Sequence, residues 1–278
     1  MNGRLKLDAS NPLIWRVTID NPPVNLYDPE MFAELRLLMD RIEADKQLKV
    51  VVFDSANPDY FVAHYDMVRG NVIPDAPGAA EFSEWPNFVT RLAHSRVVSI
   101  ASIRGRARGH GSELALACDM RFASREKAVF AQIELGVAVV PGGGAMDWLP
   151  ALVGRSRALE IVLGADDFDA DTAERYGWIN RALPDAQLDG FVNELARRIA
   201  GFERRPLELA KKFINERAGI PSEAQRWASN QAFIGTTHWP EPRQRVAQLM
   251  TQGLQQDSDT ERRLGFHVGQ HGPGGEET

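Results

Sequence analysis

The segment that most constrains how this chain can fold is GRARGHGSELALACD, residues 105–119. An apolar run at 97–101, VVSIA, precedes it and predicts a strand that is covered on both faces. The glycines that follow allow a sharp turn and a close approach to a ligand, because glycine has no Cβ. Residues 113–118 then predict a short apolar helix. A glycine turn at a helix start gathers unpaired backbone N–H groups and the positive end of a dipole, and this can hold an anion or an oxygen that becomes one during a reaction.

Glu113 lies in the first turn of this expected helix. A glutamate at such a position often does no more than complement the helix dipole. From this segment alone, that is the favoured interpretation. A catalytic role requires a second acidic group at the same place.

The composition excludes several classes of function. The 278 residues carry 32 basic and 38 acidic side chains, and a net charge of −6 argues against a general nucleic-acid surface. Cys118 is the only cysteine, which excludes an internal disulfide and a cysteine-based metal cluster and predicts a buried structural thiol. No apolar run reaches about 18 residues, and the N-terminus lacks the apolar core of a signal peptide. We therefore expect a cytoplasmic, enzyme-sized protein with neither a nucleic-acid nor a membrane partner.

The order of the periodic segments predicts an α/β fold. Residues 4–8 and 14–20 alternate apolar and polar side chains as strands do, and residues 31–42 place apolar side chains on one helical face. Residues 50–53, VVVF, predict another covered strand. Strand, strand, helix and strand form an α/β opening, whereas the chain after about residue 185 is amphipathic and helical.

A second glycine turn, 141–144 (PGGG), opens another expected helix. It is not a Walker phosphate loop, because no Gly-Lys-Ser/Thr follows it. The first turn is a poor dinucleotide motif, since it lacks the third glycine and the spaced acidic residue. A serine hydrolase acting through Ser112 is also disfavoured, because no G-x-S-x-G surrounds that serine.

With both glycine turns located, the chain resembles the enoyl-CoA hydratase/isomerase (crotonase) family. Four segments carry the resemblance, in order and at family-like spacing: 21–26 (NPPVNL), 61–67 (FVAHYDM), 105–119 and 133–144 (IELGVAVVPGGG). With weaker likeness around them they cover roughly residues 14–215, far more than a lone short motif.

The resemblance implies a spiral of β-β-α turns followed by an α-helical C-terminal region used in trimer contacts. We expect a crotonase-like core with the active site over residues 1–200, a helical oligomerisation region over 201–264, and a flexible tail over 265–278, where apolar content is low. The resemblance also implies an acyl-CoA thioester substrate and a homotrimer or a dimer of trimers. No metal and no separate cofactor is expected, because CoA is part of the substrate.

In the family, two backbone N–H groups hold the thioester oxygen, and by position these belong to Tyr65 and His110. A thioester enolate is the species that such a pair stabilises, and losing one donor typically costs about 100-fold or more in rate. By the same resemblance, residues of all four segments contact the substrate: Val24, Leu26, Ala63, His64, Asp66, Met67, Gly109, Ile133 and Pro141.

Glu134 takes the place of the family's second acidic residue, and Glu113 that of the first. Hydration of trans-2-enoyl-CoA to 3-hydroxyacyl-CoA needs a base for the water that attacks C3 and a proton for C2, so two carboxyl groups beside one water suit it. The resemblance assigns the water to Glu113 and the C2 proton to Glu134, and the alternative is that the two residues share or reverse these roles. Burial is expected to raise the pKa of at least one of them. Taken alone, Glu134 would be interpreted as an exposed carboxylate at a strand end.

The glutamate pair favours a hydratase over its rivals on the same fold. A double-bond isomerase needs only one well-placed base beside the same oxyanion hole. Another acyl-CoA lyase or hydrolase, or a non-catalytic acyl-CoA-binding protein, would also share the fold.

Two histidines depart from the family pattern. His64 and His110 stand where the family usually has glycine, in or beside the oxyanion hole. The favoured interpretation is that both imidazoles point away and only the main chain matters. The alternative is that one of them enters the pocket as an acid, a base or a hydrogen-bond donor.

Other departures concern the acyl and CoA sites. Tyr65 and Met67 are bulkier than the residues common in that loop, and Ile133 replaces a proline. The C-terminal end lacks the family's usual pattern, so its contacts to CoA do not carry over. Candidates for meeting the CoA phosphates are arginines near the expected mouth, although surface solvation is the commoner role: Arg69, Arg106 and Arg108.

Overall fold

The computed structural model of this protein describes residues 3–71 and 80–270. Its strands are β1 (Leu5–Asn11), β2 (Ile14–Ile19), β3 (Val50–Ser55), β4 (Tyr60–Val62), β5 (Val98–Ile103), β6 (Arg106–Arg108), β7 (Met120–Ser124), β8 (Val129–Ala131), β9 (Phe168–Asp169) and β10 (Arg181–Leu183). The helices of the first two thirds are α1 (Pro29–Ala44), α2 (Met67–Asn71), α3 (Ala80–His94), α4 (His110–Ala117), the 3-10 helix η1 (Glu134–Val137), α5 (Ala145–Val153), α6 (Arg155–Gly164) and α7 (Ala170–Tyr176). The remaining helices are α8 (Asp185–Ala200), α9 (Arg204–Ala218), α10 (Glu223–Thr237), α11 (Pro240–Thr251), α12 (Asp259–Arg262) and α13 (Leu264–Gly269).

The strands form two sheets that grow side by side along the chain. The larger sheet has the order β1-β2-β3-β5-β7-β10 and the smaller one β4-β6-β8-β9. Each successive pair, β3 and β4, β5 and β6, β7 and β8, contributes one strand to each sheet, and the neighbours within these series are parallel. Helices return the chain between the pairs. This is the spiral of β-β-α turns that the resemblance implies.

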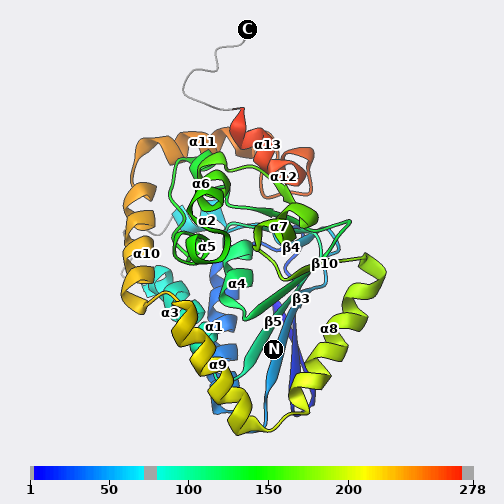
Figure 1. Ribbon diagram of the computed structural model, residues 1–278. Helices are drawn as coiled ribbons and strands as arrows, with labels where there is room; N and C mark the ends of the chain where they lie inside the picture. The colour runs from blue at the N-terminus through cyan, green and yellow to red at the C-terminus, as the bar shows by residue number, and fades with distance from the viewer. Residues whose placement is uncertain (1–2, 72–79, 271–278) are drawn as a thin grey trace.

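The larger sheet is covered on both faces, which explains its continuous apolar strands. In β3, Val50 and Val52 pack with α8, whereas Val51 and Phe53 face the main core with α1 and α4. Successive side chains of a strand point to opposite faces, so a strand between two helical layers has no polar side. Figure 1 shows α8 on one side of the sheet and α1, α3 and α4 on the other.

Asp28-Pro29 predicts a helix start, with Asp as the N-cap and Pro at the first helical position, and the structure confirms it. Asp28 caps α1, its Oδ1 accepting from the N–H of Met31 at 2.8 Å, and Pro29 occupies the first helical turn. Residues 54–68, DSANPDYFVAHYDMV, predict a turn-rich loop from their sequence, but the structure places β4 within them. A strand of three residues is too short to show a periodic pattern. Pro86 lies inside α3 and does not divide the helix into two.

The C-terminal part is helical, as expected, and it covers one end of the core. α10 packs on α3 and α5 (Figure 1), whereas α11 and α13 contact η1. The expected tail is wrong over its first residues: α13 is a helix whose Leu264, Gly265 and Val268 are buried. Its few apolar side chains suffice because they pack closely against η1, where a Cβ at Gly136 would lie 2.4 Å from Cβ of Val268. Residues 271–278 of the expected tail lie outside the described residues.

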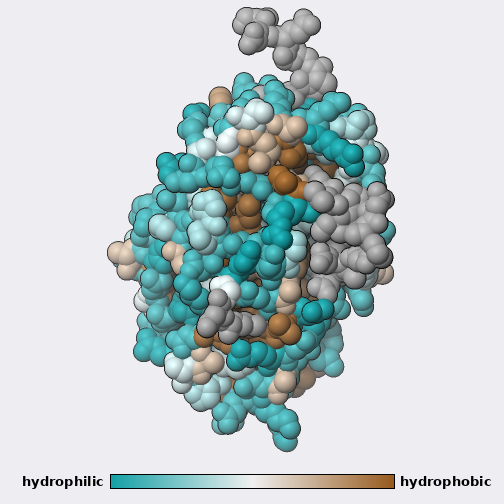
Figure 2. All heavy atoms as spheres, turned by 180° about the vertical axis from the view of Figure 1, so that it is seen from behind, coloured by the Kyte–Doolittle hydropathy of each residue, from teal (hydrophilic) through white to brown (hydrophobic). Residues whose placement is uncertain are grey.

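Three further findings concern the surface and the interior of the described residues. No helix there is long and apolar enough to cross a membrane. No group of three or more histidine, cysteine, aspartate or glutamate side chains among residues 3–71 and 80–270 is arranged to hold a metal ion. The face opposite to the view of Figure 1 is largely hydrophilic, with hydrophobic side chains gathered in patches (Figure 2).

Candidate active site

The candidate site lies where the strands of the small sheet end. β4, β6 and β8 run parallel, so their carboxyl ends meet at one edge. The segments 63–67, 109–113 and 132–134 follow these three strands directly. Ligands of parallel sheets characteristically bind outside the carboxyl ends of the strands. Three of the four segments that carry the family resemblance therefore come together at this edge.

The loop after β4 is held by backbone pairing with the chain after β2. Tyr27 donates its N–H to the carbonyl of His64 at 2.9 Å and accepts from the N–H of Asp66 at 3.0 Å. Since successive peptide groups of an extended strand point in opposite directions, the N–H of Tyr65 points away from Tyr27.

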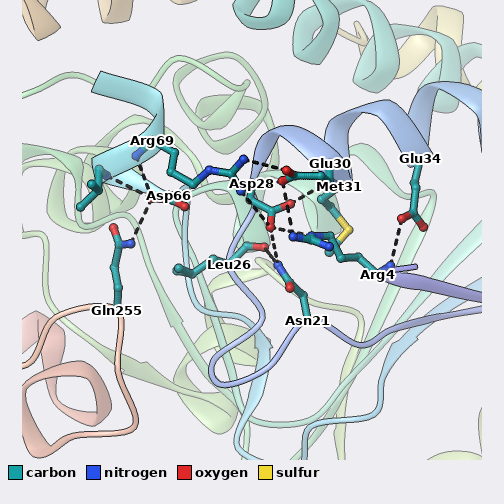
Figure 3. A network of polar contacts seen from close by, with 11 residues as sticks. Arg4, Asn21, Leu26, Asp28, Glu30, Met31, Glu34, Asp66, Arg69 and Gln255 are labelled. Carbon is teal, nitrogen blue, oxygen red and sulfur yellow. Dashed lines mark hydrogen bonds and ion pairs between the residues drawn. The ribbon is translucent and has the colours of Figure 1, made fainter. Parts of the chain in front are cut away.

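Side chains of the loop itself and of two distant segments reinforce it (Figure 3). Asp66 caps α2 by accepting from the N–H groups of Val68 and Arg69 at 3.1 and 3.0 Å. Gln255, from the segment between α11 and α12, donates to Asp66 at 3.0 Å and accepts from the N–H of Met67 at 2.8 Å. Arg69 forms two hydrogen bonds with Glu30 of α1, at 2.6 and 2.7 Å. These contacts fix the position of the Tyr65 main chain.

The turn after β6 depends on glycine, as the sequence predicts. Gly109 has φ +48° and ψ −120°, a conformation that disfavours a Cβ. Its N–H donates to the carbonyl of Ala131 at 3.1 Å, which ties the turn to β8. A Cβ at Gly109 would also lie 3.2 Å from Oε1 of Glu134, so the missing side chain lets that carboxyl group approach. His110 begins α4 immediately after this turn.

Glu113 is fully buried and partly satisfied by main chain. Its Oε1 accepts from the N–H of Gly143 at 2.8 Å and from that of Ala145 at 3.2 Å. These N–H groups lie at the start of α5, so Glu113 projects from α4 to cap a different helix. The simple interpretation that it complements its own helix dipole is therefore incomplete. Its Oε2 has no hydrogen-bond partner among the described residues.

Burial raises the pKa of Glu113 to about 7, even though the N–H groups of Ala145 and Gly143 act in the opposite direction. Asp147 raises that pKa further through its charge. At neutral pH this carboxyl group is therefore close to its midpoint, where it can both take and give a proton.

Glu134 is also buried, which excludes the interpretation of an exposed carboxylate at a strand end. It begins η1 and is 7% exposed. Burial, followed by the charge of Glu113, raises the pKa of Glu134 well above its ordinary value. In the amide orientation that satisfies both groups, Gln132 donates to the two oxygens of Glu134 at 3.1 Å and accepts from Ser112 Oγ at 2.9 Å.

A small apolar cavity of about 50 Å³ opens at this edge. Four of the expected substrate-contacting residues line it, together with Tyr65, His110 and Glu134: His64, Met67, Gly109 and Ile133. Five other expected contacts do not: Val24, Leu26, Ala63, Asp66 and Pro141. Val24 and Ala63 instead pack with Tyr60 in a small buried cluster at the start of the loop that follows β4. Glu113 is likewise not among the lining residues of this cavity.

The two histidines occupy different surroundings. Nε2 of His64 lies 3.2 Å from Oε2 of Glu261 on α12, and its Nδ1 lies 2.6 Å from the carbonyl oxygen of Tyr65. The His110 ring packs among aromatic side chains and lines the cavity. Both histidines line the cavity, so the expectation that both imidazoles point away from the pocket is not confirmed: the side chain of His110 is 10% exposed, and that of His64 is 1% exposed.

The arginines proposed for CoA phosphates are occupied by protein groups. Arg108 is fully buried and binds Asp167 through two hydrogen bonds of 2.7 and 2.6 Å. Arg106 donates to the carbonyl of Arg262 at 2.7 Å, and Arg69 binds Glu30 as described above. Cys118 is buried, as expected, and burial raises the pKa of its thiol to about 12.

Sequence reasoning missed the residues that the C-terminal helices bring to the cavity: Phe233, Thr237, Pro242 and Val246. They lie on α10 and α11, a region whose sequence departs from the family pattern. The apolar faces of these helices were visible, but nothing local indicated which cavity they would meet. Gln132 and Glu261 were missed for the same reason, because their roles depend on partners from other segments.

Comparison with known proteins identifies what the chain is similar to. The sequence profile of the family described as "Enoyl-CoA hydratase/isomerase" matches residues 10–250. The short-chain-enoyl-CoA hydratase of Clostridium acetobutylicum is 31% identical over 201 residues, covering 72% of this chain and 76% of that protein. A crystal structure of a "putative enoyl-CoA hydratase" from Streptomyces avermitilis superposes with a TM-score of 0.90 at 41% identity, covering 97% of this chain and 98% of the other. DspI of Pseudomonas aeruginosa has a TM-score of 0.71 at 27% identity, covering 90% and 96%.

Proposed function

The chain belongs to the enoyl-CoA hydratase/isomerase family and is an acyl-CoA enzyme of the crotonase type, and from that premise we propose that it hydrates a trans-2-enoyl-CoA to a 3-hydroxyacyl-CoA. The observation that carries this proposal is the pair of buried carboxyl groups, Glu113 and Glu134. They follow adjacent strands, and the charge of one raises the pKa of the other.

The two carboxyl groups suit opposite roles in hydration. Glu113, with a pKa of about 7, is ionised often enough near neutral pH to accept a proton from the water that attacks C3. Glu134, whose pKa is held well above its ordinary value, keeps a proton for C2. The hydroxide adds to C3 as the C2 proton is delivered, so the enzyme ends the step with Glu113 protonated and Glu134 ionised. A proton exchange then restores the starting state.

The main-chain N–H groups of Tyr65 and His110 are the proposed oxyanion hole. Both residues line the cavity, one after β4 and the other at the start of α4. The N–H of Tyr65 points away from Tyr27, and that of His110 belongs to the first turn of a helix, where the dipole favours negative charge. Preorganised donors of this kind stabilise the enolate oxygen that develops during addition.

A double-bond isomerase is the second candidate, and one observation favours it. Glu134 lines the cavity whereas Glu113 does not, and isomerisation needs only one base next to the substrate. In that reaction Glu134 would move a proton between C2 and C4, with the same oxyanion hole holding the thioester oxygen.

Assembly as a homotrimer or a dimer of trimers is proposed from the family. α9 has no buried residue and exposes Leu209, Phe213 and Ile214, an apolar face that a second copy of the chain would cover. Light scattering after size-exclusion chromatography tests this directly: a monomer at micromolar concentration would contradict it.

Turnover of crotonyl-CoA by the wild type and by Glu113→Gln and Glu134→Gln tests the proposed reaction. Glutamine keeps the shape and removes the acid, so folding changes little. Hydration by the wild type, with kcat lowered about 100-fold or more in both variants, supports the proposal. Conversion of a 3-enoyl-CoA without hydration, lost only in Glu134→Gln, would favour the isomerase, and binding without turnover would contradict both.

A further inference from the structure

The His110 side chain lies in a cage of aromatic rings beside the candidate catalytic pair. Ring centroids of Trp85 and Tyr65 lie 4.9 and 5.0 Å from the imidazole, and those of Tyr27 and Phe32 lie 5.8 and 6.3 Å from it. Apolar walls on these sides restrict the ring to one region of space. An imidazole held in this way is preorganised.

One ring nitrogen of His110 lies near the carboxyl group of Glu113. Nδ1 of His110 lies 3.4 Å from Oε2 of Glu113, the oxygen that has no hydrogen-bond partner among the described residues. The other carboxyl oxygen is already occupied by the N–H groups of Gly143 and Ala145. The separation is slightly long for a hydrogen bond, as is common for catalytic contacts before substrate binds.

The same ring reaches the cavity, which Glu113 does not. His110 lines the cavity and its side chain is 10% exposed, whereas the side chain of Glu113 has no exposed surface and that residue is absent from the lining residues in the part of the chain that the structure describes. A carboxyl group in that position needs an intermediary if it is to exchange a proton with a water beside the substrate. The imidazole contacts both the carboxyl group and the cavity.

We infer that His110 is a catalytic residue, whose imidazole relays the proton between the attacking water and Glu113. This inference rests on the proposed hydration. In the productive tautomer, Nδ1–H faces Glu113 and the Nε2 lone pair faces the water. As the water oxygen bonds to C3, one water proton passes to Nε2 and the Nδ1 proton passes to the Glu113 carboxylate. The imidazole is neutral before and after the step, and the C2 proton still comes from Glu134.

The apolar surroundings of His110 are consistent with an imidazole that stays neutral throughout the relay. Burial, followed by the charge of His64, lowers the pKa of His110 to about 3, so an imidazolium is strongly disfavoured there. A proton gained at one nitrogen must therefore be matched by a proton lost from the other. Four further titratable groups surround the pair and shape its pH dependence: His64 on the β4 loop, Glu134 on η1, Asp147 on α5 and Tyr27 after β2.

Substitutions at His110 separate a relay from a structural role. His110→Asn keeps an N–H group that can reach Glu113 but cannot pass a proton on, and His110→Phe fills the cage without any polar atom. We expect both to lower kcat for crotonyl-CoA hydration about 100-fold or more and to remove the ascending limb of the pH–rate profile near pH 7. Affinity for butyryl-CoA, a saturated thioester, is expected to change little. Phe191→Leu, a change of the same kind on α8 where the ring packs on Phe122 at the opposite face of the larger sheet, serves as the control and should keep the wild-type profile.

Three results of these measurements would overturn the relay. If His110→Asn keeps the wild-type kcat and profile while Glu113→Gln is inactive, the relay is overturned and the proposed hydration stands. If His110→Asn is active and only His110→Phe is not, the ring has a structural role and the relay is again overturned. If the wild type hydrates no 2-enoyl thioester, the proposed function itself fails, and the relay falls with it.

Discussion

The two histidines at the ends of β4 and β6 offer a comparison within one site. Both are buried, and both stand where the resemblance implies a glycine. His64 precedes one proposed oxyanion-hole donor, the N–H of Tyr65, and His110 supplies the other. His64 has a charged partner, because Nε2 lies 3.2 Å from Oε2 of Glu261, whereas His110 has aromatic rings and a carboxyl group of raised pKa. The surroundings, and not the residue type, decide which of them can take part in chemistry.

Opposite pKa shifts follow from these surroundings. Burial lowers the pKa of His64, but the charge and hydrogen bond of Glu261, with the hydrogen bond to the Tyr65 carbonyl, more than offset this and raise the pKa overall. When it is protonated, His64 therefore joins the carbonyl oxygen of Tyr65 to Glu261 on α12. His110 has no such counter-ion, and burial lowers its pKa to about 3. His64 and Glu261 thus form a charged pair, which we call the clamp, whereas His110 is a neutral ring beside the proposed path of the proton.

Removing Glu261 should have the largest effect on stability. Glu261→Ala leaves His64 buried without its counter-ion, and breaking a buried ion pair on one side costs about 3–5 kcal/mol of unfolding free energy. Urea denaturation at pH 6 measures this loss. The exposed Glu194 on α8 gives a matched control, since Glu194→Ala should change stability little. Similar small losses in both variants would contradict the charged clamp.

Glu113→Gln should instead stabilise the protein in alkaline solution. A pKa raised from 4.5 to about 7 means that folding opposes ionisation of Glu113, and above pH 7 this costs about 3 kcal/mol. The amide keeps an acceptor for Gly143 and Ala145 and removes the cost. Thermal unfolding of wild type and variant at pH 8 and pH 4 tests the prediction: a gain at pH 8 that disappears below about pH 4.5. A loss of stability at pH 8 would show that the ionised carboxylate is favoured in the fold.

The histidines themselves should give stability profiles of opposite slope. A raised pKa means that the contribution of His64 is fully present below about pH 6.5 and is lost as pH rises through its folded value. A lowered pKa means that His110 costs stability as pH falls from 6.5 toward 3, by at most about 1.4 kcal/mol per pH unit. Relative to wild type, His110→Phe should therefore gain stability in acid and His64→Gln should lose it. Profiles with the same slope would break the comparison.

The smallest effect on the free energy of unfolding is expected at Gln255, which links the segment before α12 to the loop after β4. Gln255→Ala removes the hydrogen bonds to Met67 and Asp66, for a loss of about 1 kcal/mol. Because Glu261 and His64 remain, the stability advantage in acid should persist. Urea denaturation at pH 6 and pH 8 measures both properties. A loss as large as that of Glu261→Ala would mean that Gln255, and not the ion pair, fastens the loop.

Local patterns predicted the parts of the site that depend on neighbouring residues. The strand, glycine turn and helix around residues 105–119 are all present, since each is set by composition within a few positions. The Asp28 cap and the two buried glutamates also follow from short motifs or from the resemblance built on them. The spiral itself was available only through that resemblance, because strand order is a long-range property.

Features that depend on distant partners were not predictable. His64 and Glu261 are 197 positions apart, and no pattern around either residue indicates the other. Arg108 was expected near the mouth, but Asp167 makes it a buried structural residue. The aromatic cage of His110 draws on the chain after β2, on α1, on α3 and on the β4 loop, so the direction of its ring could not be read from segment 105–119 alone.

The pH dependence of kcat for crotonyl-CoA hydration tests the central claim most directly, because the claim is that two buried carboxyl groups divide the work of acid and base. The account predicts a rate that rises through about pH 7 as Glu113 ionises and falls at higher pH as Glu134 loses its proton, with the ascending limb absent in Glu113→Gln. A Glu113→Gln enzyme that keeps both the wild-type rate and the ascending limb would contradict it.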